Sequence, residues 1–369
     1  MPSKLPDEAL TLLRTRREAL REALLRWFER EARPLPWRRD RTPYRIWVAE
    51  VMLQQTQAET VKRYYADFLR RFPTVEALAA APLEAVLKAW EGMGYYRRAR
   101  LLHRAAQQIV AEQGGALPQE AEALRRLPGI GRYTAGAVAS LAFGQPVPAV
   151  DGNVRRVMAR LLALPAPTTG EVEAAVAELL PDDRPGDFNE ALMELGATIC
   201  RPRSPECRRC PWRAFCQAHR QGAPERYPAP KGRPALPHYE VAAAVLIEAG
   251  RVLLAQRRPE DMLGGLWEFP GGKREAGESL EAALRRELQE EMAIQVEVGE
   301  ALLTLEHAYT HFRITLTAFR CRRVAGEVRC LECADFRWAD AATLSAVPMA
   351  ATDRRIAQVV APLLENAPP

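Results

Sequence analysis

Four cysteines stand close together just past the middle of the 369-residue chain. Cys200, Cys207, Cys210 and Cys216 follow the spacing Cys-x6-Cys-x2-Cys-x5-Cys. Four thiolates in one compact loop can bind a single tetrahedral metal ion or a cubane iron–sulfur cluster. The ligands alone do not separate zinc from a 4Fe–4S cluster, because both accept four thiolates. The spacing therefore predicts a metal site but does not decide between zinc and an iron–sulfur cluster.

Glu50 is the misfit in an otherwise apolar segment, Trp47–Thr56, that has a helical pattern. Thr42 and Pro43 come before it and are a predicted N-cap and first-turn proline. On a helix, Glu50 shares a face with Leu53, where loss of water would raise the pKa of the carboxyl and keep it protonated. The alternative is a glutamate without a chemical role, either buried with a partner or exposed.

A second acidic residue, Asp151, follows a glycine-containing hairpin. The segment 127–134, LPGIGRYT, joins two helical stretches. Gly129 and Gly131 allow a tight turn whose N–H groups could seat a phosphate. Asp151 stands just before an expected helix over residues 154–162, so it is also a candidate N-cap. The two roles are compatible, because helix N–H groups favour an ionised carboxylate at neutral pH.

Three glutamates in the C-terminal part share one face of an expected helix over residues 279–292. Glu287, Glu290 and Glu291 stand at positions i, i+3 and i+4, so their carboxylates lie close together on a helix. Such carboxylates repel one another unless a divalent cation binds or solvent screens them. The pattern indicates a Mg²⁺ site, and the alternative is an acidic face in water.

The elements that must position these residues divide at a proline-rich segment. Apolar residues recur at helical spacing through residues 1–226, which predicts an all-α domain that includes the cysteine loop 200–216. Residues 227–238 contain four prolines and are predicted to form a semi-rigid linker. Residues 239–369 combine short β-type runs with the expected helix, which predicts an α+β domain. The fold class predicted is therefore multidomain.

The composition is that of an ordinary globular protein, with 48% hydrophobic and 27% charged residues. No apolar run is long enough to cross a membrane, and the first 33 residues lack the apolar core of a signal peptide. We therefore expect a cytoplasmic monomer without a membrane partner. The net charge of +5 permits attraction to phosphate but does not establish it. Three further cysteines lack a fourth ligand and are expected to be ordinary thiols: Cys321, Cys330 and Cys333.

The cysteine loop, the hairpin and the two carboxyls together resemble one group of DNA-repair enzymes. The cysteine spacing at the end of a helical domain resembles the cluster loop of endonuclease III and MutY glycosylases. The hairpin with Asp151 resembles the helix-hairpin-helix glycosylase superfamily, and AEVMLQQTQ around Glu50 resembles the MutY segment. The resemblance implies a 4Fe–4S cluster, base-excision repair and a nucleoid location. The arginines of the cysteine loop would face DNA phosphates, and the alternative is that they only solvate the loop.

The MutY resemblance implies removal of adenine mispaired with 8-oxoguanine or guanine in double-stranded DNA. Glu50 would protonate adenine N7 and later serve as a base, while Asp151 would stabilise or transiently bond the oxocarbenium-like sugar. The adenine must first leave the base stack. Where endonuclease III has a Schiff-base lysine, this chain has Tyr133. The resemblance therefore implies a monofunctional glycosylase, and the glycosylase/lyase is the disfavoured alternative.

The same resemblance implies roles for residues around the two carboxyls. Tyr133 and Asn153 would support the carboxylate of Asp151. One arginine would line the adenine pocket, and three residues would contact the lesion or its surroundings. Packing is the alternative role for these four, which are Arg38, Gln55, Thr56 and Tyr95.

The C-terminal part resembles the Nudix hydrolase MutT. Residues 272–294 match the Nudix box except that Ala293 replaces a glycine. MutY enzymes carry a MutT-like domain that recognises 8-oxoguanine, and Tyr309, Thr310 and His311 lie in a segment that resembles their recognition loop. The resemblance implies a lesion-binding domain of α+β fold. The nearly complete box leaves open a second activity, the Mg²⁺-dependent hydrolysis of oxidised deoxynucleoside triphosphates.

Overall fold

The structure is a computed structural model that describes residues 5–230, 232 and 235–365. Residues 231, 233 and 234 of the predicted linker lie outside the described residues. Contacts divide the chain into two compact units, and the division does not follow the linker alone. Residues Ala81–His103 group with the C-terminal residues Arg233–Pro369.

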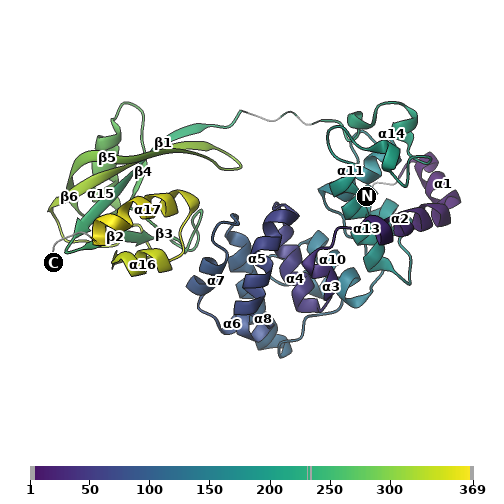
Figure 1. Ribbon diagram of the computed structural model, residues 1–369, viewed down its shortest axis with the longest axis horizontal. Helices are drawn as coiled ribbons and strands as arrows, with labels where there is room; N and C mark the ends of the chain where they lie inside the picture. Colours follow the sequence, from purple (N-terminus) through teal and green to yellow (C-terminus); the bar gives the residue numbers. More distant parts are fainter. Residues whose placement is uncertain (1–4, 231, 233–234, 366–369) are drawn as a thin grey trace. The chain divides into compact units, whose positions relative to one another are not determined.

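The first unit is all-α, as predicted, and comprises Met1–Ala80 and Arg104–Gly232 (Figure 1). Helix α8, Arg97–Gln113, begins in the second unit and ends in the first. The other helices of the first unit are α1 Asp7–Thr15, α2 Arg17–Glu31, α3 Pro36–Arg39, α4 Pro43–Leu53, α5 Ala58–Arg71, α6 Val75–Ala80, α9 Ala121–Leu124, α10 Arg132–Phe143, α11 Gly152–Leu161, α12 Thr169–Leu179, α13 Pro185–Thr198, α14 Gln217–Arg220, and the 3-10 turns Cys207–Arg209 and Pro224–Arg226.

A core formed by α1, α2, α11, α12 and α13 holds the cysteine loop in place. Trp212 of that loop is 2% exposed and belongs to this core. Its indole N–H donates to the carbonyl oxygen of Leu20 on α2 at 2.9 Å. The partner satisfies the one polar atom of a ring that is otherwise buried among apolar side chains. The loop is therefore anchored to the helices by its own tryptophan.

Helix α10 passes very close to the segment that precedes Asp151. A Cβ atom at Gly136 would lie 2.3 Å from the carbonyl oxygen of Pro148, so a side chain at this position would collide with backbone. Helix α10 also packs against α4 and α13. These contacts bring Glu50 on α4, Tyr133 on α10 and the first turn of α11 to one place.

The second unit holds a mixed seven-stranded sheet with the strand order β3-β2-β1-β6-β5, where β4 pairs with β1 and β7 with β2. Strands β1 and β6 run parallel and the other pairs are antiparallel. Its elements are α7 Leu83–Ala89, β1 His238–Glu248, β2 Arg251–Gln256, β3 Trp267–Glu268, β4 Gly271–Lys273, α15 Leu280–Met292, β5 Gln295–Ala308, β6 Arg313–Ala325, β7 Asp335–Ala339, α16 Ala341–Ala346 and α17 Ala351–Glu365 (Figure 1).

Strand β1 shows how the sheet is covered on both faces. Ala242, Ala244 and Leu246 belong to the same buried cluster as the apolar side of α15. The alternate residues, Ala243 and Val245, belong to a second cluster with α16 and α17. Because successive side chains of a strand point to opposite faces, helices lie on each side of the sheet. The predicted α+β fold is confirmed.

Candidate active site

One large cavity in the first unit gathers the residues that the sequence singled out there. Its volume is about 1030 Å³. It lies among α3, α4, the hairpin, the first turn of α11 and α13. The sequence-predicted residues that line it are Arg38, Glu50, Gln55, Thr56, Gly129, Gly131, Tyr133, Asp151 and Asn153. Tertiary packing thus brings the segment with α3 and α4 together with the hairpin, the first turn of α11 and α13, which all lie much later in the chain.

Glu50 reaches the cavity from α4 but is only 3% exposed. Burial raises the pKa of its carboxyl to about 7, a hydrogen bond from Tyr133 opposes this rise, and the negative charges of Glu190 and Asp151 add to it. A carboxyl with this pKa is present in both protonation states near neutral pH. It can therefore give or take a proton without a large energetic penalty.

Tyr133 supports a different carboxyl from the one expected. Its hydroxyl oxygen lies 2.6 Å from Oε2 of Glu50 and 3.1 Å from Sδ of Met193. The MutY resemblance had placed Tyr133 beside Asp151. Burial raises the pKa of Tyr133 well above its ordinary value, so the phenol keeps its proton. The hydrogen bond to Glu50 therefore has the phenol as its donor.

Asp151 is the N-cap of α11, as the sequence allowed. Its carboxylate accepts from the backbone N–H of Val154 at 2.7 Å and from Nδ2 of Asn153 at 2.8 Å. These hydrogen bonds lower the pKa of Asp151, but burial raises it by more, so the net shift is upward. The sequence had indicated only the capping contribution, because burial of a residue next to a helix end depends on what packs over it.

Asn153 connects Asp151 to the cysteine loop through Arg156, which no sequence motif had indicated. Nη2 of Arg156 donates to Oδ1 of Asn153 at 2.8 Å. Nε of the same arginine donates to the carbonyl oxygen of Cys200 at 2.7 Å. The only signal in the sequence was the i, i+3 spacing of Asn153 and Arg156 on a helix, which is too common to interpret alone.

Arg38 lines the cavity, but two buried glutamates already bind its guanidinium group. Nε lies 2.6 Å from Oε1 of Glu190, and Nη2 lies 2.9 Å from Oε2 of Glu194. These glutamates on α13 are 5% and 1% exposed. Two glutamates four positions apart on an otherwise apolar helix are the signal in the sequence that marks them. Arg38 is therefore held in one orientation toward the cavity.

The four cysteines of the metal prediction line one small cavity together with Arg160. Nη1 of Arg160 lies 3.4 Å from Sγ of Cys200. Burial raises the pKa of Cys210 to about 12 and the pKa of Cys207 and Cys216 above their ordinary value. Within the described residues, no group of three or more histidine, cysteine, aspartate or glutamate side chains is arranged to hold a metal ion. The structure thus brings the four thiols to one cavity without identifying a metal.

The predicted recognition residues of the second unit lie at and near the turn between β5 and β6. The hydroxyl oxygens of Tyr95 and Thr310 are 2.7 Å apart. Tyr95 is 40% exposed and has a φ of 50°, next to Gly94 with a φ of 73°. Tyr309 packs its ring against Phe312, whereas His311 is exposed. Tyr95 and the turn therefore form one surface within this unit.

The Nudix-box glutamates lie on α15 and share an arginine. Nη1 of Arg286 lies 3.1 Å from Oε1 of Glu287 and 3.0 Å from Oε2 of Glu290. Burial, together with the negative charge of Glu287, raises the pKa of Glu291 to about 7. Ala293 follows the helix with a φ of 57°, in the left-handed region where the box has glycine. The one departure from the motif thus occupies a position that favours glycine.

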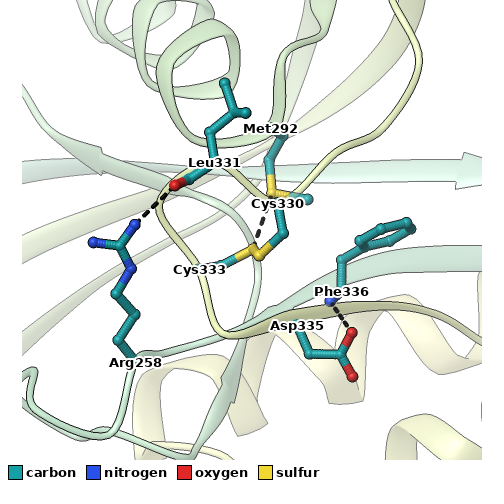
Figure 2. Close-up of a disulfide and its surroundings, with 7 residues drawn as sticks. All are labelled: Arg258, Met292, Cys330, Leu331, Cys333, Asp335 and Phe336. Atoms are coloured by element: carbon teal, nitrogen blue, oxygen red, sulfur yellow. Dashed lines mark hydrogen bonds between the residues drawn. A yellow bond between two sulfur atoms is a disulfide. The ribbon is translucent and has the colours of Figure 1, made fainter.

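Two of the cysteines expected to be ordinary thiols form a disulfide. Cys330 and Cys333 are bonded to one another, and their Cα atoms are 5.3 Å apart (Figure 2). The expectation was wrong for this pair, because the loop after β6 folds back on itself and brings the two side chains together. Cys321 is a free and buried thiol, as expected.

Two family models match the chain, one in each half. The model described as "HhH-GPD superfamily base excision DNA repair protein" matches residues 48–182, and the model described as "NUDIX domain" matches residues 242–359. No helix of the described residues meets the length and hydropathy of a membrane span. Together with the fold and the cavity, the two family matches define a DNA-repair glycosylase of the helix-hairpin-helix class that carries a Nudix domain.

Individual relatives give a narrower assignment. An adenine DNA glycosylase of Rattus norvegicus is 38% identical over 360 residues, which cover 82% of this chain and 70% of that protein. A thermostable thymine-DNA glycosylase has a similar structure, with 30% identity, a TM-score of 0.52 and coverage of 56% of this chain and 98% of that one. An endonuclease III in a non-covalent DNA complex is also similar, with 25% identity and a TM-score of 0.51. The similarity covers 57% of this chain and 97% of that one. The chain belongs to the adenine DNA glycosylase family.

Proposed function

We propose that the protein excises adenine from double-stranded DNA where adenine is mispaired with 8-oxoguanine or guanine. The observation that carries this proposal is the meeting of Glu50 and Asp151 at one cavity. One carboxyl holds a proton near neutral pH, and the other accepts hydrogen bonds from the first turn of a helix. Membership of the adenine DNA glycosylase family supports the same activity.

The chemistry follows from what breaking an N-glycosidic bond requires. Adenine leaves as a neutral base only if it receives a proton, and protonated Glu50 supplies one to N7. The sugar then carries positive charge at its anomeric carbon, which the carboxylate of Asp151 stabilises. Ionised Glu50 next accepts a proton from the attacking water. Tyr133 holds Glu50 in place through the 2.6 Å hydrogen bond throughout these steps.

We propose that the other cavity residues position the DNA. Arg38 is fixed by Glu190 and Glu194 and so presents a rigid donor to the flipped adenine. The hairpin glycines Gly129 and Gly131 leave backbone N–H groups near the cavity for a phosphate. The solved complex of a similar endonuclease III with DNA supports DNA as the partner. Gln55 and Thr56, which also line the cavity, would contact the bases beside the flipped one.

The four cysteines fit a 4Fe–4S cluster in their chemistry. Cys200, Cys207, Cys210 and Cys216 line one cavity, and Arg160 places a cationic donor beside a sulfur atom that would be a thiolate ligand. When bound, the cluster would fix the loop, whose arginines then face DNA phosphates. The same loop contacts Arg156 and, through Asn153, the catalytic aspartate.

In the second unit we propose that the turn between β5 and β6 recognises 8-oxoguanine. The Tyr95 and Thr310 hydroxyls form one polar surface, and His311 adds a ring that can donate or accept a hydrogen bond. Tyr309 supports the turn by packing against Phe312. An exposed ring such as Tyr95 can stack on an unpaired base.

The test of this proposal is base release from matched duplexes. Duplexes with adenine opposite 8-oxoguanine, guanine or thymine are incubated with the protein, and free adenine and abasic sites are measured. We expect release from the first two duplexes and little from the third. Release of no adenine from any duplex would refute the proposal. Borohydride should trap no covalent enzyme–DNA adduct, because a phenol at position 133 cannot form a Schiff base.

A second candidate activity, the Mg²⁺-dependent hydrolysis of oxidised deoxynucleoside triphosphates, rests on Glu287 and Glu291. Each carboxyl has its pKa raised by burial, and the charge of Glu287 raises that of Glu291. A divalent cation would relieve this repulsion. The test is pyrophosphate release from 8-oxo-dGTP with and without Mg²⁺, comparing the protein with its Glu287→Gln variant. Equal rates for both proteins would reject this activity.

A further inference from the structure

The disulfide between Cys330 and Cys333 lies in the loop 326–334, which connects β6 to β7 (Figure 2). Only two residues separate the cysteines, and one of them, Leu331, is 52% exposed. Both cysteines are themselves partly exposed. A thiol in solution can therefore reach the sulfur atoms, which a buried disulfide does not allow.

The loop is attached to the end of the helix that carries the Nudix-box glutamates. The backbone N–H of Arg329 donates to the carbonyl oxygen of Met292 at 3.1 Å, and that of Leu331 donates to the carbonyl of Glu291 at 2.8 Å. On the other side, Nη2 of Arg258 donates to the carbonyl of Leu331 at 2.8 Å (Figure 2). Leu331 lies within the segment that the disulfide closes and Arg329 directly precedes it, so the bond stands where the loop is attached to α15.

The sulfur atom of Met292 lies beside Cys333 and can contact it in both the oxidised and the reduced state of the cysteine pair. Sγ of Cys333 lies 3.9 Å from Sδ of Met292, which is buried (Figure 2). A disulfide sulfur has no proton, so in the oxidised state the two sulfur atoms are only in contact. A reduced Cys333 carries a thiol proton, and Met292 then offers an acceptor for it. Reduction therefore does not leave the Cys333 thiol without a partner.

We propose that Cys330 and Cys333 form a thiol–disulfide exchange site whose reductant is a dithiol, and that reduction loosens the loop 326–334 from the end of α15. In the first step a thiolate of the dithiol bonds to one cysteine sulfur and the other cysteine leaves as a thiolate. The second thiol of the reagent then displaces the first cysteine. Two electrons and two protons pass to the cysteine pair, and the reagent becomes a disulfide.

The domain keeps its fold when this bond is reduced. A disulfide that closes a very short loop restricts the unfolded chain less than one that closes a long loop. The sheet and both helical layers are built from apolar clusters in which Cys333 takes part only at the edge. The effect of reduction is therefore local, at the hydrogen bonds from Arg329 and Leu331 to α15.

The sequence allows a direct test in the full-length protein. Arg329 and Arg337 are trypsin sites that flank the peptide CLECADFR, which contains Cys330 and Cys333 and no other cysteine. The native protein is equilibrated in mixtures of reduced and oxidised dithiothreitol, alkylated, digested and weighed. We expect the peptide to change reversibly between no alkyl group and two. A peptide with two alkyl groups in every mixture, or with none, overturns the proposal.

Hydrogen exchange measures the consequence for the loop. We expect the amides of Arg329 and Leu331 to lose protection on reduction, whereas the centre of α15 keeps it. The Cys330→Ser/Cys333→Ser variant should show the reduced pattern in every mixture. Cys321→Ser, which changes a buried thiol outside the pair, should respond like the unmodified protein. Unchanged protection on reduction would refute the coupling to α15. None of these readouts depends on adenine release.

Discussion

Each of the two units contains a glutamate whose pKa is raised to about 7, but the surroundings of these glutamates differ. Glu50 accepts a hydrogen bond from a neutral phenol and faces a cavity of about 1030 Å³. The negative charge of Glu287 acts on Glu291, and Glu287 itself forms an ion pair with Arg286. A raised pKa alone therefore does not identify a catalytic acid. Glu50 differs from Glu291 because it lines a large cavity that also contains a second carboxyl, that of Asp151.

The largest effect expected from this comparison is the loss of adenine release in Glu50→Gln. The amide cannot deliver a proton, and general acid catalysis contributes about 10²- to 10⁴-fold in rate. Glu291→Gln is the matched control, because it neutralises the partly buried glutamate whose pKa is similar. Single-turnover adenine release should fall by that range for Glu50→Gln and stay unchanged for Glu291→Gln. Equal losses in both variants would remove the distinction between the two sites.

Asp151→Asn tests the second carboxyl with a smaller expected loss. Asparagine is as good an N-cap as aspartate, so α11 and the stability of the fold should be retained. The negative charge facing the sugar is lost, and we expect adenine release to fall on the order of 10²- to 10³-fold. Thermal unfolding serves as the control for the cap. A variant that melts early and releases adenine normally after refolding would contradict the catalytic role.

Tyr133→Phe should change the pH dependence more than the maximal rate. The phenol hydrogen bond favours the ionised form of Glu50 and so lowers its pKa. Its removal raises that pKa, and the rate that needs protonated Glu50 declines at higher pH than in the unmodified protein. A pH profile of single-turnover rates measures this shift. A falling limb that moves to lower pH would show that Tyr133 acts in some other way.

The smallest effect concerns the end of α15. Ala293 has a φ of 57°, which costs alanine more than glycine. We expect Ala293→Gly to raise the free energy of unfolding by about 1 kcal/mol. Urea unfolding followed by circular dichroism checks this value. Adenine release should be unaffected, and a loss of stability would show that the Ala293 methyl group packs better than its backbone conformation suggests.

Much of the fold could be predicted from local pattern. Helical spacing indicated the all-α part, and the apolar runs around Gly250 correspond to β1 and β2. Ser279 is the N-cap of α15, which ends at Met292 as expected. The grouping of Ala81–His103 with the C-terminal residues could not be predicted, because it depends on long-range contacts and no local signal marks it. The disulfide joins cysteines only three positions apart, but their spacing alone does not show whether the loop turns so that the two sulfur atoms meet.

The sequence by itself determined which groups are available: a carboxyl in an apolar helix, a capping aspartate, a tyrosine where a lysine would form a Schiff base, and four closely spaced cysteines. These depend on residue type and local spacing. Only the tertiary structure decided that Tyr133 donates to Glu50, that Glu190 and Glu194 hold Arg38, and that Cys330 pairs with Cys333. The partners of Tyr133 and Arg38 come from distant segments, whereas the cysteine pair depends on the turn of its own loop. In both cases the distance and burial that set the interaction energies exist only after the chain has packed.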